Sequence, residues 1–163
     1  MSYPPAPPIP SPSTNSGEPP LWAPYYGASI GVAISRFWRK YATFSGRASR
    51  SEYWWWYLVY AIFIFIFEIV AFTVSVGGTV IDSTTGAVSV SPAYYVVLGV
   101  LWIVSLGVLV PSLAISWRRL HDTNRSGGYY FLGLIPFVGV IILIVFLASA
   151  SDPAGARFDQ PQP

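Results

Sequence analysis

Three long apolar segments, separated by short polar ones, dominate the hydropathy pattern of the chain. They cover residues 54–76, 94–117 and 129–148. Each is at least as long as the roughly 20 residues that a helix needs to cross a hydrocarbon core about 30 Å thick. The pattern therefore predicts three transmembrane helices, joined by a polar loop at 77–93 and a shorter basic loop at 118–128.

The third apolar segment contains two residues that disturb a helix, Pro136 and Gly139. A proline inside a helix removes a backbone hydrogen bond and kinks the chain. We expect the segment to cross the membrane nevertheless, which would place the C-terminal tail on the outer side. The alternative is a re-entrant hairpin, which would return the tail to the cytoplasm.

Residues 28–44 have a different pattern, in which apolar residues recur at three- and four-residue spacings. This periodicity predicts an amphipathic helix. Its apolar positions are Ile30, Ile34, Phe37, Trp38 and Tyr41, and the basic positions between them are Arg36, Arg39 and Lys40. An aromatic face and a basic face together suit the membrane–water interface, so we expect an interfacial helix. The alternative is a helix packed on a protein partner.

The segment before this helix, residues 1–27, is rich in proline. Nine of the fifteen prolines of the chain lie there. Because proline fixes φ and lacks an N–H donor, we expect a disordered, extended tail that serves as a soluble spacer. A ligand for a proline-binding module is the alternative. The membrane domain would then cover residues 28–159, followed by a short tail at 160–163.

The composition supports a membrane location. Hydrophobic residues make up 53% of the 163 residues and charged residues only 10%, against about 25% charged residues in soluble domains. Cysteine is absent and histidine occurs once, which argues against a zinc site. We therefore expect an all-α integral membrane protein with no metal and no cofactor.

Basic residues are distributed unevenly around the apolar segments. Five of the nine precede the first segment and three lie in the loop at 118–128, whereas the loop at 77–93 has none. Basic residues accumulate in the cytoplasmic loops of membrane proteins. We therefore expect a multi-pass protein whose N-terminus and basic loop are cytoplasmic.

Two stretches of the chain resemble a known family. The first is FSGRASRSEYW at 44–54; the second combines Pro111 with RRLHDT at 118–123, Arg125-Ser126 and LIPFVG at 134–139. These stretches are similar to the domain of unknown function 805 family, small bacterial inner-membrane proteins. The resemblance covers about residues 36–159, with departures at 127–129 and 156–159. It implies a multi-span protein of the bacterial cytoplasmic membrane, and no established activity comes with it.

Seven residues are candidates for a lipid- or partner-binding site on the cytoplasmic face: Arg47, Arg50, Arg118, Arg119, His121, Asp122 and Arg125. An arginine near an anionic membrane surface contributes about 1 kcal/mol of attraction. Ion pairs with Glu52 and Asp122, or a role in topology alone, are the alternatives for these arginines. His121 and Asp122 are adjacent, and adjacent side chains on a helix do not face each other, so we do not expect a catalytic pair.

Glu68 is the one ionisable residue deep within an apolar segment. Intramembrane acids are costly and commonly functional. The residue therefore supports an alternative function, a small transporter or channel subunit, which would have to be an oligomer because three helices rarely enclose a pathway. A hydrogen bond from Ser105 or Thr73 is the structural alternative for Glu68.

The leading interpretation is a structural or interaction module rather than an enzyme. Its basic cytoplasmic face would contact anionic lipid headgroups or a protein partner. A homo-oligomer or a complex with another membrane protein is compatible with this interpretation, and nucleic acid is not expected as a partner.

Overall fold

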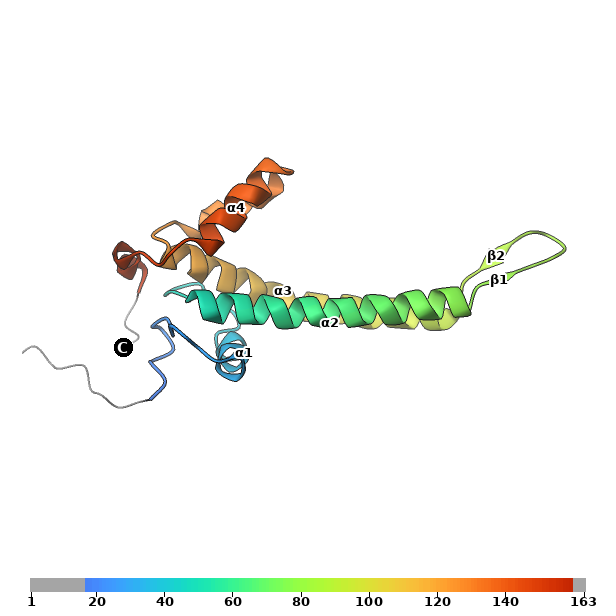
Figure 1. Ribbon diagram of the computed structural model, residues 1–163, viewed down its shortest axis with the longest axis horizontal. Coiled ribbons are helices and arrows are strands. Elements are labelled where there is room, and N and C mark those ends of the chain that lie inside the picture. The colour runs from blue at the N-terminus through green and yellow to red at the C-terminus, as the bar shows by residue number, and fades with distance from the viewer. Residues whose placement is uncertain (1–16, 160–163) are drawn as a thin grey trace, which may run out of the picture.

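The computed structural model describes residues 17–159. Two long helices, α2 (Arg50–Gly77) and α3 (Pro92–Asp122), lie side by side as an antiparallel hairpin (Figure 1). A two-stranded hairpin joins them at one end and the remaining helices gather at the other. These further elements are α1 (Ile30–Arg39), β1 (Val80–Ile81), β2 (Val88–Ser89), η1 (Gly127–Leu134), α4 (Val138–Ala148) and η2 (Pro153–Phe158).

Both helices of the hairpin are long and apolar enough to cross a membrane. At 1.5 Å per residue, α2 and α3 are about 42 and 46 Å long. Their outer surfaces carry large apolar side chains, among them Phe72 at 70% exposure and Ile103 at 72%. An apolar surface of this extent is unstable in water, and a lipid environment removes that cost. The first two predicted segments therefore correspond to two candidate membrane-spanning helices.

Polar side chains join α2 to α3. The Trp56 indole donates to the Ser112 hydroxyl at 3.3 Å, and the Tyr60 hydroxyl donates to Ser105 at 3.2 Å. The hydroxyls of Tyr57 and Ser116 are 3.0 Å apart. Helices in lipid gain no hydrophobic attraction from each other, so interhelical hydrogen bonds of this kind help hold them together.

The third apolar segment corrects our prediction of one transmembrane helix over 129–148, disturbed by Pro136 and Gly139. The chain instead forms the 3₁₀ helix η1, turns at Pro136–Phe137, and returns as α4. The turn is a γ-turn: the Val138 N–H donates to the Pro136 carbonyl at 2.8 Å, and Phe137 has φ 62° and ψ −72°. Gly139 permits it, because a Cβ at this position would collide with the carbonyl of Leu132.

The C-terminal tail therefore returns to the end of the hairpin from which η1 departs. The Asp152 N–H donates to the Asp122 carbonyl at 2.8 Å, and the Gly46 N–H donates to the Phe158 carbonyl at 3.0 Å. The eleven residues of α4 span only about 16 Å, roughly half of a hydrocarbon core. A chain that turns back in this way has the geometry of the re-entrant alternative.

The proline-rich segment also differs from the prediction. We expected disorder over residues 1–27, and residues 1–16, like the short tail at 160–163, lie outside the described part of the chain. Residues 17–27, however, have defined positions beside α1. Their backbone carbonyls accept hydrogen bonds from Arg36, as described below, which accounts for the order of a segment with few donors of its own.

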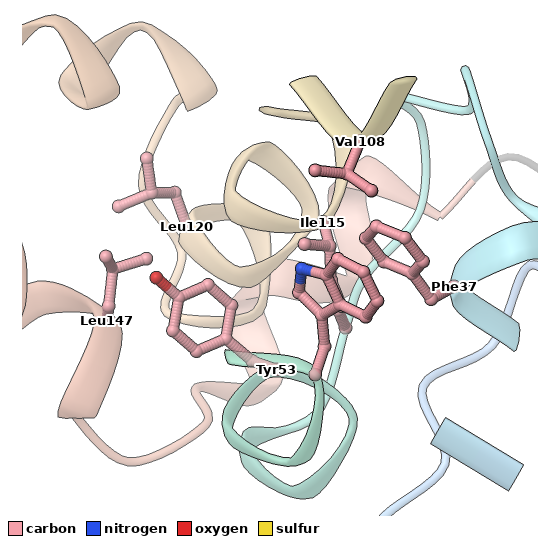
Figure 2. Packing of buried hydrophobic residues seen from close by; sticks show 8 residues of the cluster. Phe37, Tyr53, Val108, Ile115, Leu120 and Leu147 are labelled. Atoms are coloured by element: carbon pink, nitrogen blue, oxygen red, sulfur yellow. The ribbon is translucent and has the colours of Figure 1, made fainter. Parts of the chain in front are cut away.

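Buried apolar residues from four helices meet near the end of the hairpin that carries α1 and α4 (Figure 2). Phe37 of α1 stacks on Trp56 of α2, with ring centroids 3.4 Å apart. Ile115 and Leu120 of α3 and Leu147 of α4 belong to the same cluster. In Figure 1, α1 lies across the hairpin rather than along it. The small strands β1 and β2 pair at the opposite end and were not expected.

Candidate functional site

The charged residues of the chain are concentrated at one end of the structure, which we call the cap. The cap consists of residues 17–52, 118–126 and 149–159. All nine lysine and arginine residues lie within it, together with five of the seven acids. The cap therefore has a net charge of +4, whereas the loop at the other end has one acid, Asp82, and no basic residue.

Glu52 is the centre of the first of two charged clusters in the cap. It occupies the third position of α2 and forms a capping box with Ser49, an arrangement that satisfies free N–H groups at a helix start. Its Oε2 accepts hydrogen bonds from the N–H groups of Ser49 at 2.9 Å and Tyr25 at 3.1 Å. Its Oε1 accepts one from Nε of Arg36 at 2.6 Å. The carboxylate thus joins α1, α2 and the N-terminal segment.

Arg36 holds the N-terminal segment in place. The side chain is buried at 1% exposure. Besides Glu52, its guanidinium pairs with Glu18 at 3.0 Å and donates to the carbonyl of Pro19 at 2.9 Å. Further hydrogen bonds reach the carbonyls of Pro20 and Ala23. One arginine therefore satisfies a segment whose prolines leave several carbonyl groups without local partners.

Lys40 and Arg118 are buried beside this cluster. Nζ of Lys40 lies 3.9 Å from Oε1 of Glu52 and has no hydrogen-bond partner within residues 17–159. The pKa of Lys40 is lowered to about 7, mainly by burial; Glu52 opposes this shift, and nearby Arg118 and Arg36 contribute to it. Arg118 donates through Nε to the Ala114 carbonyl at 3.2 Å. One carboxylate is thus surrounded by three buried cationic side chains.

Asp122 is the centre of the second cluster, and its side chain is fully buried. It accepts hydrogen bonds from Arg119, from the Tyr26 hydroxyl at 2.8 Å, and from Ser151. Arg119 also donates to the carbonyl of Leu147 at 2.8 Å. Burial and the hydrogen bond to Asp122 raise the pKa of Tyr26. This cluster connects the end of α3 to the end of α4 and to the N-terminal segment.

The last helix, η2, is attached by Arg47 and His121. The guanidinium of Arg47 forms a two-pronged ion pair with Asp159, whose closest contact is 2.6 Å. Its hydrogen bonds to Asp159 raise the pKa of Arg47. Nδ1 of His121 lies 3.0 Å from the carbonyl of Gly46, and the imidazole stacks on Phe158 with centroids 4.1 Å apart.

The structure therefore brings the seven predicted residues together in the cap but gives them different environments. Arg118, Arg119, His121 and Asp122 are buried. Arg125 is half-buried, with its guanidinium 4.1 Å from the centre of the Phe146 ring. Arg50 is exposed, and within the described residues it forms no ion pair.

Two residues that the sequence placed on a solvated face, Arg36 and Lys40, are buried instead. The helical periodicity could not reveal this, because their partners lie 12 or more residues away in the chain. The one local signal was the capping-box spacing of Ser49 and Glu52, which marks the start of α2 and puts the carboxylate in position.

Glu68 lies on the exposed outer surface of α2. The two hydroxyls proposed as its partners are engaged elsewhere: Thr73 donates to the Ile69 carbonyl at 2.8 Å, and Ser105 accepts from Tyr60. The carboxylate therefore does not face the contact between α2 and α3, and the arrangement does not favour a transport pathway through this pair of helices.

Comparison with known proteins places this architecture in a family. The family described as "Protein of unknown function (DUF805)" matches residues 41–160. The chain belongs to this family. It is 37% identical over 123 residues to the inner membrane protein YhaH of Escherichia coli (strain K12), covering 74% of this chain and 87% of that protein. It is 32% identical over 120 residues to the inner membrane protein YhaI of the same strain, covering 74% and 86%.

These matches confirm the resemblance and the membrane class, and no solved structure matches the chain. The family match begins at residue 41, so it includes Asp122 and its partners Arg119 and Ser151. Arg36 and Lys40, which lie beside Glu52, and Tyr26, which donates to Asp122, precede the matched residues. The matched part of the chain thus contains the hairpin and most of the second cluster, and the residues before it contribute to both clusters.

Proposed function

We propose that this DUF805 protein is a two-span, non-enzymatic module of the bacterial cytoplasmic membrane whose cap contacts anionic lipid headgroups on the cytoplasmic side. The observation that carries the proposal is the separation of charge along the hairpin. Every basic residue of the chain is in the cap, and none lies in the β1–β2 loop. Basic residues accumulate on the cytoplasmic side of membrane proteins.

Within this arrangement, α2 and α3 cross the membrane, while η1 and α4 enter from the cytoplasmic side and return. The short α4 reaches only about the middle of the bilayer. Helix α1 would lie at the interface, where Trp38 and Tyr41 are 48% and 40% exposed. Aromatic side chains are enriched at that depth. The N-terminus and the C-terminal tail are then both cytoplasmic.

Three exposed arginines are available for contact with headgroups: Arg39, Arg50 and Arg157. The other basic residues are buried or half-buried within the cap. Each exposed arginine contributes about 1 kcal/mol of attraction to an anionic surface. Three of them favour an anionic over a zwitterionic surface by a measurable margin, which depends on ionic strength.

The orientation is tested with reporter fusions at Pro163 and in the loop near Asp82. We expect the fusion at Pro163 to report a cytoplasmic location and the fusion near Asp82 to report the outer side. An outer location for Pro163 together with an outer location for the loop near Asp82 would refute the two-span arrangement. An outer Pro163 with a cytoplasmic Asp82 loop would place the cap on the outer side and refute the proposed orientation.

The lipid contact is tested by electron spin resonance of the reconstituted protein with spin-labelled phosphatidylglycerol or phosphatidylcholine. We expect a preference for phosphatidylglycerol that falls when Arg39, Arg50 and Arg157 are all replaced by Gln and that persists when all three are replaced by Lys. If the Gln variant keeps the full preference, the exposed arginines do not contact lipid, and a protein partner becomes the better interpretation of the cap.

A further inference from the structure

Two adjoining hollows meet at the start of α2. The first is a groove of about 710 Å³ on the surface of the helix, lined mainly by apolar side chains: Trp54, Trp55, Tyr57, Leu58 and Ala61, with Arg50 and Ser51 at its end. The second is a pocket of about 520 Å³ in the cap, lined by Tyr26, Gly27, Ser49, Arg50, Ser51, Ala150 and Ser151. The two share Arg50 and Ser51, so they adjoin at these residues. We consider them together as one depression with an apolar and a polar part.

The apolar part runs along α2 away from the cap and therefore into the bilayer. From Arg50 to Ala61 the helix rises about 16 Å, which is close to the thickness of one leaflet of a hydrocarbon core about 30 Å thick. Positions 50, 54, 58 and 61 follow the three- and four-residue spacing of one helix face. The groove thus has the direction and length of a phospholipid acyl chain in the cytoplasmic leaflet.

The polar part lies at the depth of the headgroups, where the N-terminal segment meets the chain after α4. Hydroxyl groups from both sides line it, including those of Tyr26 and Ser151. The nearby carboxylate of Asp122 is fully buried and already bonded to Arg119, Tyr26 and Ser151. It therefore does not compete with a ligand for the guanidinium of Arg50.

Arg50 stands where the two parts join. It is exposed and forms no ion pair within residues 17–159, in contrast to Arg47 and Arg119, which are paired with Asp159 and Asp122. A guanidinium presents several N–H donors in a fixed plane that matches a phosphate group. Charge at the junction and an apolar groove on one side are complementary to an amphiphile with an anionic head.

We propose that this depression is a site for one anionic glycerophospholipid, with an acyl chain in the groove along α2 and the phosphate on Arg50. The inference rests on the proposed function, because it assumes that the cap faces the cytoplasmic leaflet. It goes beyond the proposed function because it replaces a diffuse attraction of three arginines to anionic headgroups with a discrete site that binds one lipid. A free phosphate would use Arg50 and leave the groove empty, so the groove favours the lipid.

The site is tested by native mass spectrometry of the purified full chain after addition of phosphatidylglycerol or phosphatidylcholine at equal concentrations. We expect one phosphatidylglycerol to be retained in preference to phosphatidylcholine. Arg50→Gln should weaken this retention about tenfold, the value of one charge-assisted hydrogen bond. Arg39→Gln is the matched control, since Arg39 is exposed in the cap but lies outside both hollows, and it should change retention less than twofold.

A second pair of variants tests the groove. Ala61→Trp should fill it and weaken retention of phosphatidylglycerol, whereas Ile69→Trp, on the exposed surface of α2 beyond the groove, should not. Both positions face lipid, so neither change disturbs the interior. Equal effects of the two Trp variants, or equal effects of Arg50→Gln and Arg39→Gln, would overturn the discrete site.

Glycerol 3-phosphate serves as a probe for the headgroup alone. We expect it not to displace the retained lipid at concentrations a hundred times higher, because it cannot occupy the groove; full displacement would overturn the assignment to a lipid. The outcome also separates the two proposals. A bulk preference for anionic lipid without a retained molecule removes the site and keeps the proposed function, whereas loss of the bulk preference in every lipid mixture removes both.

Discussion

Nε of Arg36 lies 2.6 Å from Oε1 of Glu52, and both side chains are almost fully buried. The ion pair connects α1 to the first turn of α2 across 16 residues of sequence. Glu52 is also part of the capping box of α2, and Arg36 also binds the carbonyls of the N-terminal segment. A single contact therefore fixes the helix start, the interfacial helix and the segment before it.

Removing one partner of this pair should strongly destabilise the cap. Arg36→Gln leaves the Glu52 carboxylate buried without its closest cation, and breaking a buried pair costs about 3–5 kcal/mol. We expect a large fall in the thermal unfolding temperature of the protein in detergent, together with proteolytic sensitivity of residues 17–29.

Arg39 provides the matched control for this experiment. It is the same residue type on the same helix, and its side chain is 56% exposed. Arg39→Gln should change stability by less than about 0.5 kcal/mol. If Arg36→Gln is no more harmful than Arg39→Gln, the ion pair does not hold the cap together.

Lys40 should titrate near neutral pH. Its pKa is lowered to about 7 by burial, and it is the only lysine in the chain. Reductive methylation with ¹³C therefore places a single side-chain probe on it, distinguishable from the terminal amine. We expect the methyl resonance to shift with a midpoint near pH 7, and a midpoint near the ordinary value of about 10.4 would contradict the burial of a free amine.

The same lowered pKa gives a direction for stability. Between pH 7 and about 10.4 the unfolded state binds a proton at Lys40 that the folded state does not, so the free energy of unfolding contributed by this group rises with pH in that window. Below pH 7 the folded state carries the full cost of the buried charge. Lys40→Met should therefore stabilise the protein at pH 6 and have much less effect at pH 10, as measured by thermal unfolding at both pH values.

The two long helices α2 and α3 could be predicted because long apolar runs determine them locally. The turn within the third apolar segment could not be predicted, although Pro136 and Gly139 in the sequence indicated a disturbed helix. A proline can be accommodated in a membrane helix, as Pro111 is within α3. The turn at Pro136 requires the close approach of Gly139 to the carbonyl of Leu132, a contact between η1 and α4 that exists only after both have formed.

The candidate site was predictable in position but not in detail. The uneven distribution of basic residues indicated that they would gather at one end of the structure, and they do. Periodicity alone placed Arg36 and Lys40 on the polar face of an interfacial helix, because their burial depends on Glu52 and on carbonyls of the N-terminal segment. Likewise, sequence could not separate Arg50, which forms no ion pair among residues 17–159, from Arg47, which is paired with Asp159 from the far end of the chain.

The turn between η1 and α4 should be sensitive to a single methyl group. Gly139→Ala places a Cβ against the backbone carbonyl of Leu132, which cannot move aside as a side chain can. We expect a destabilisation of about 1–3 kcal/mol, the range for an overpacked interior position. The unfolding temperature should fall, and the hydrogen bonds between Arg119 and the end of α4 should weaken with it.

Gly99 offers the comparison, because a Cβ at that position in α3 meets nothing within 4 Å. Gly99→Ala should leave stability unchanged or raise it by up to about 1 kcal/mol, as expected for glycine replaced by alanine within a helix. Equal and small effects of the two substitutions would show that the close approach of η1 and α4 is absent in the protein.

Glu68 should be dispensable for folding and for any effect of the protein on membrane permeability. Its carboxylate lies on the outer surface of α2, and the polar groups nearest in sequence are bonded elsewhere. An acid near the centre of a membrane helix opposes insertion by up to about 3 kcal/mol, so Glu68→Gln should increase insertion and thermal stability. Vesicles that contain the Glu68→Gln variant should show the same ion and proton flux as vesicles that contain the unmodified chain. If the unmodified chain supports a flux and Glu68→Gln abolishes it, the result would support the transporter interpretation. A second copy of the chain would then have to enclose the path beside α2.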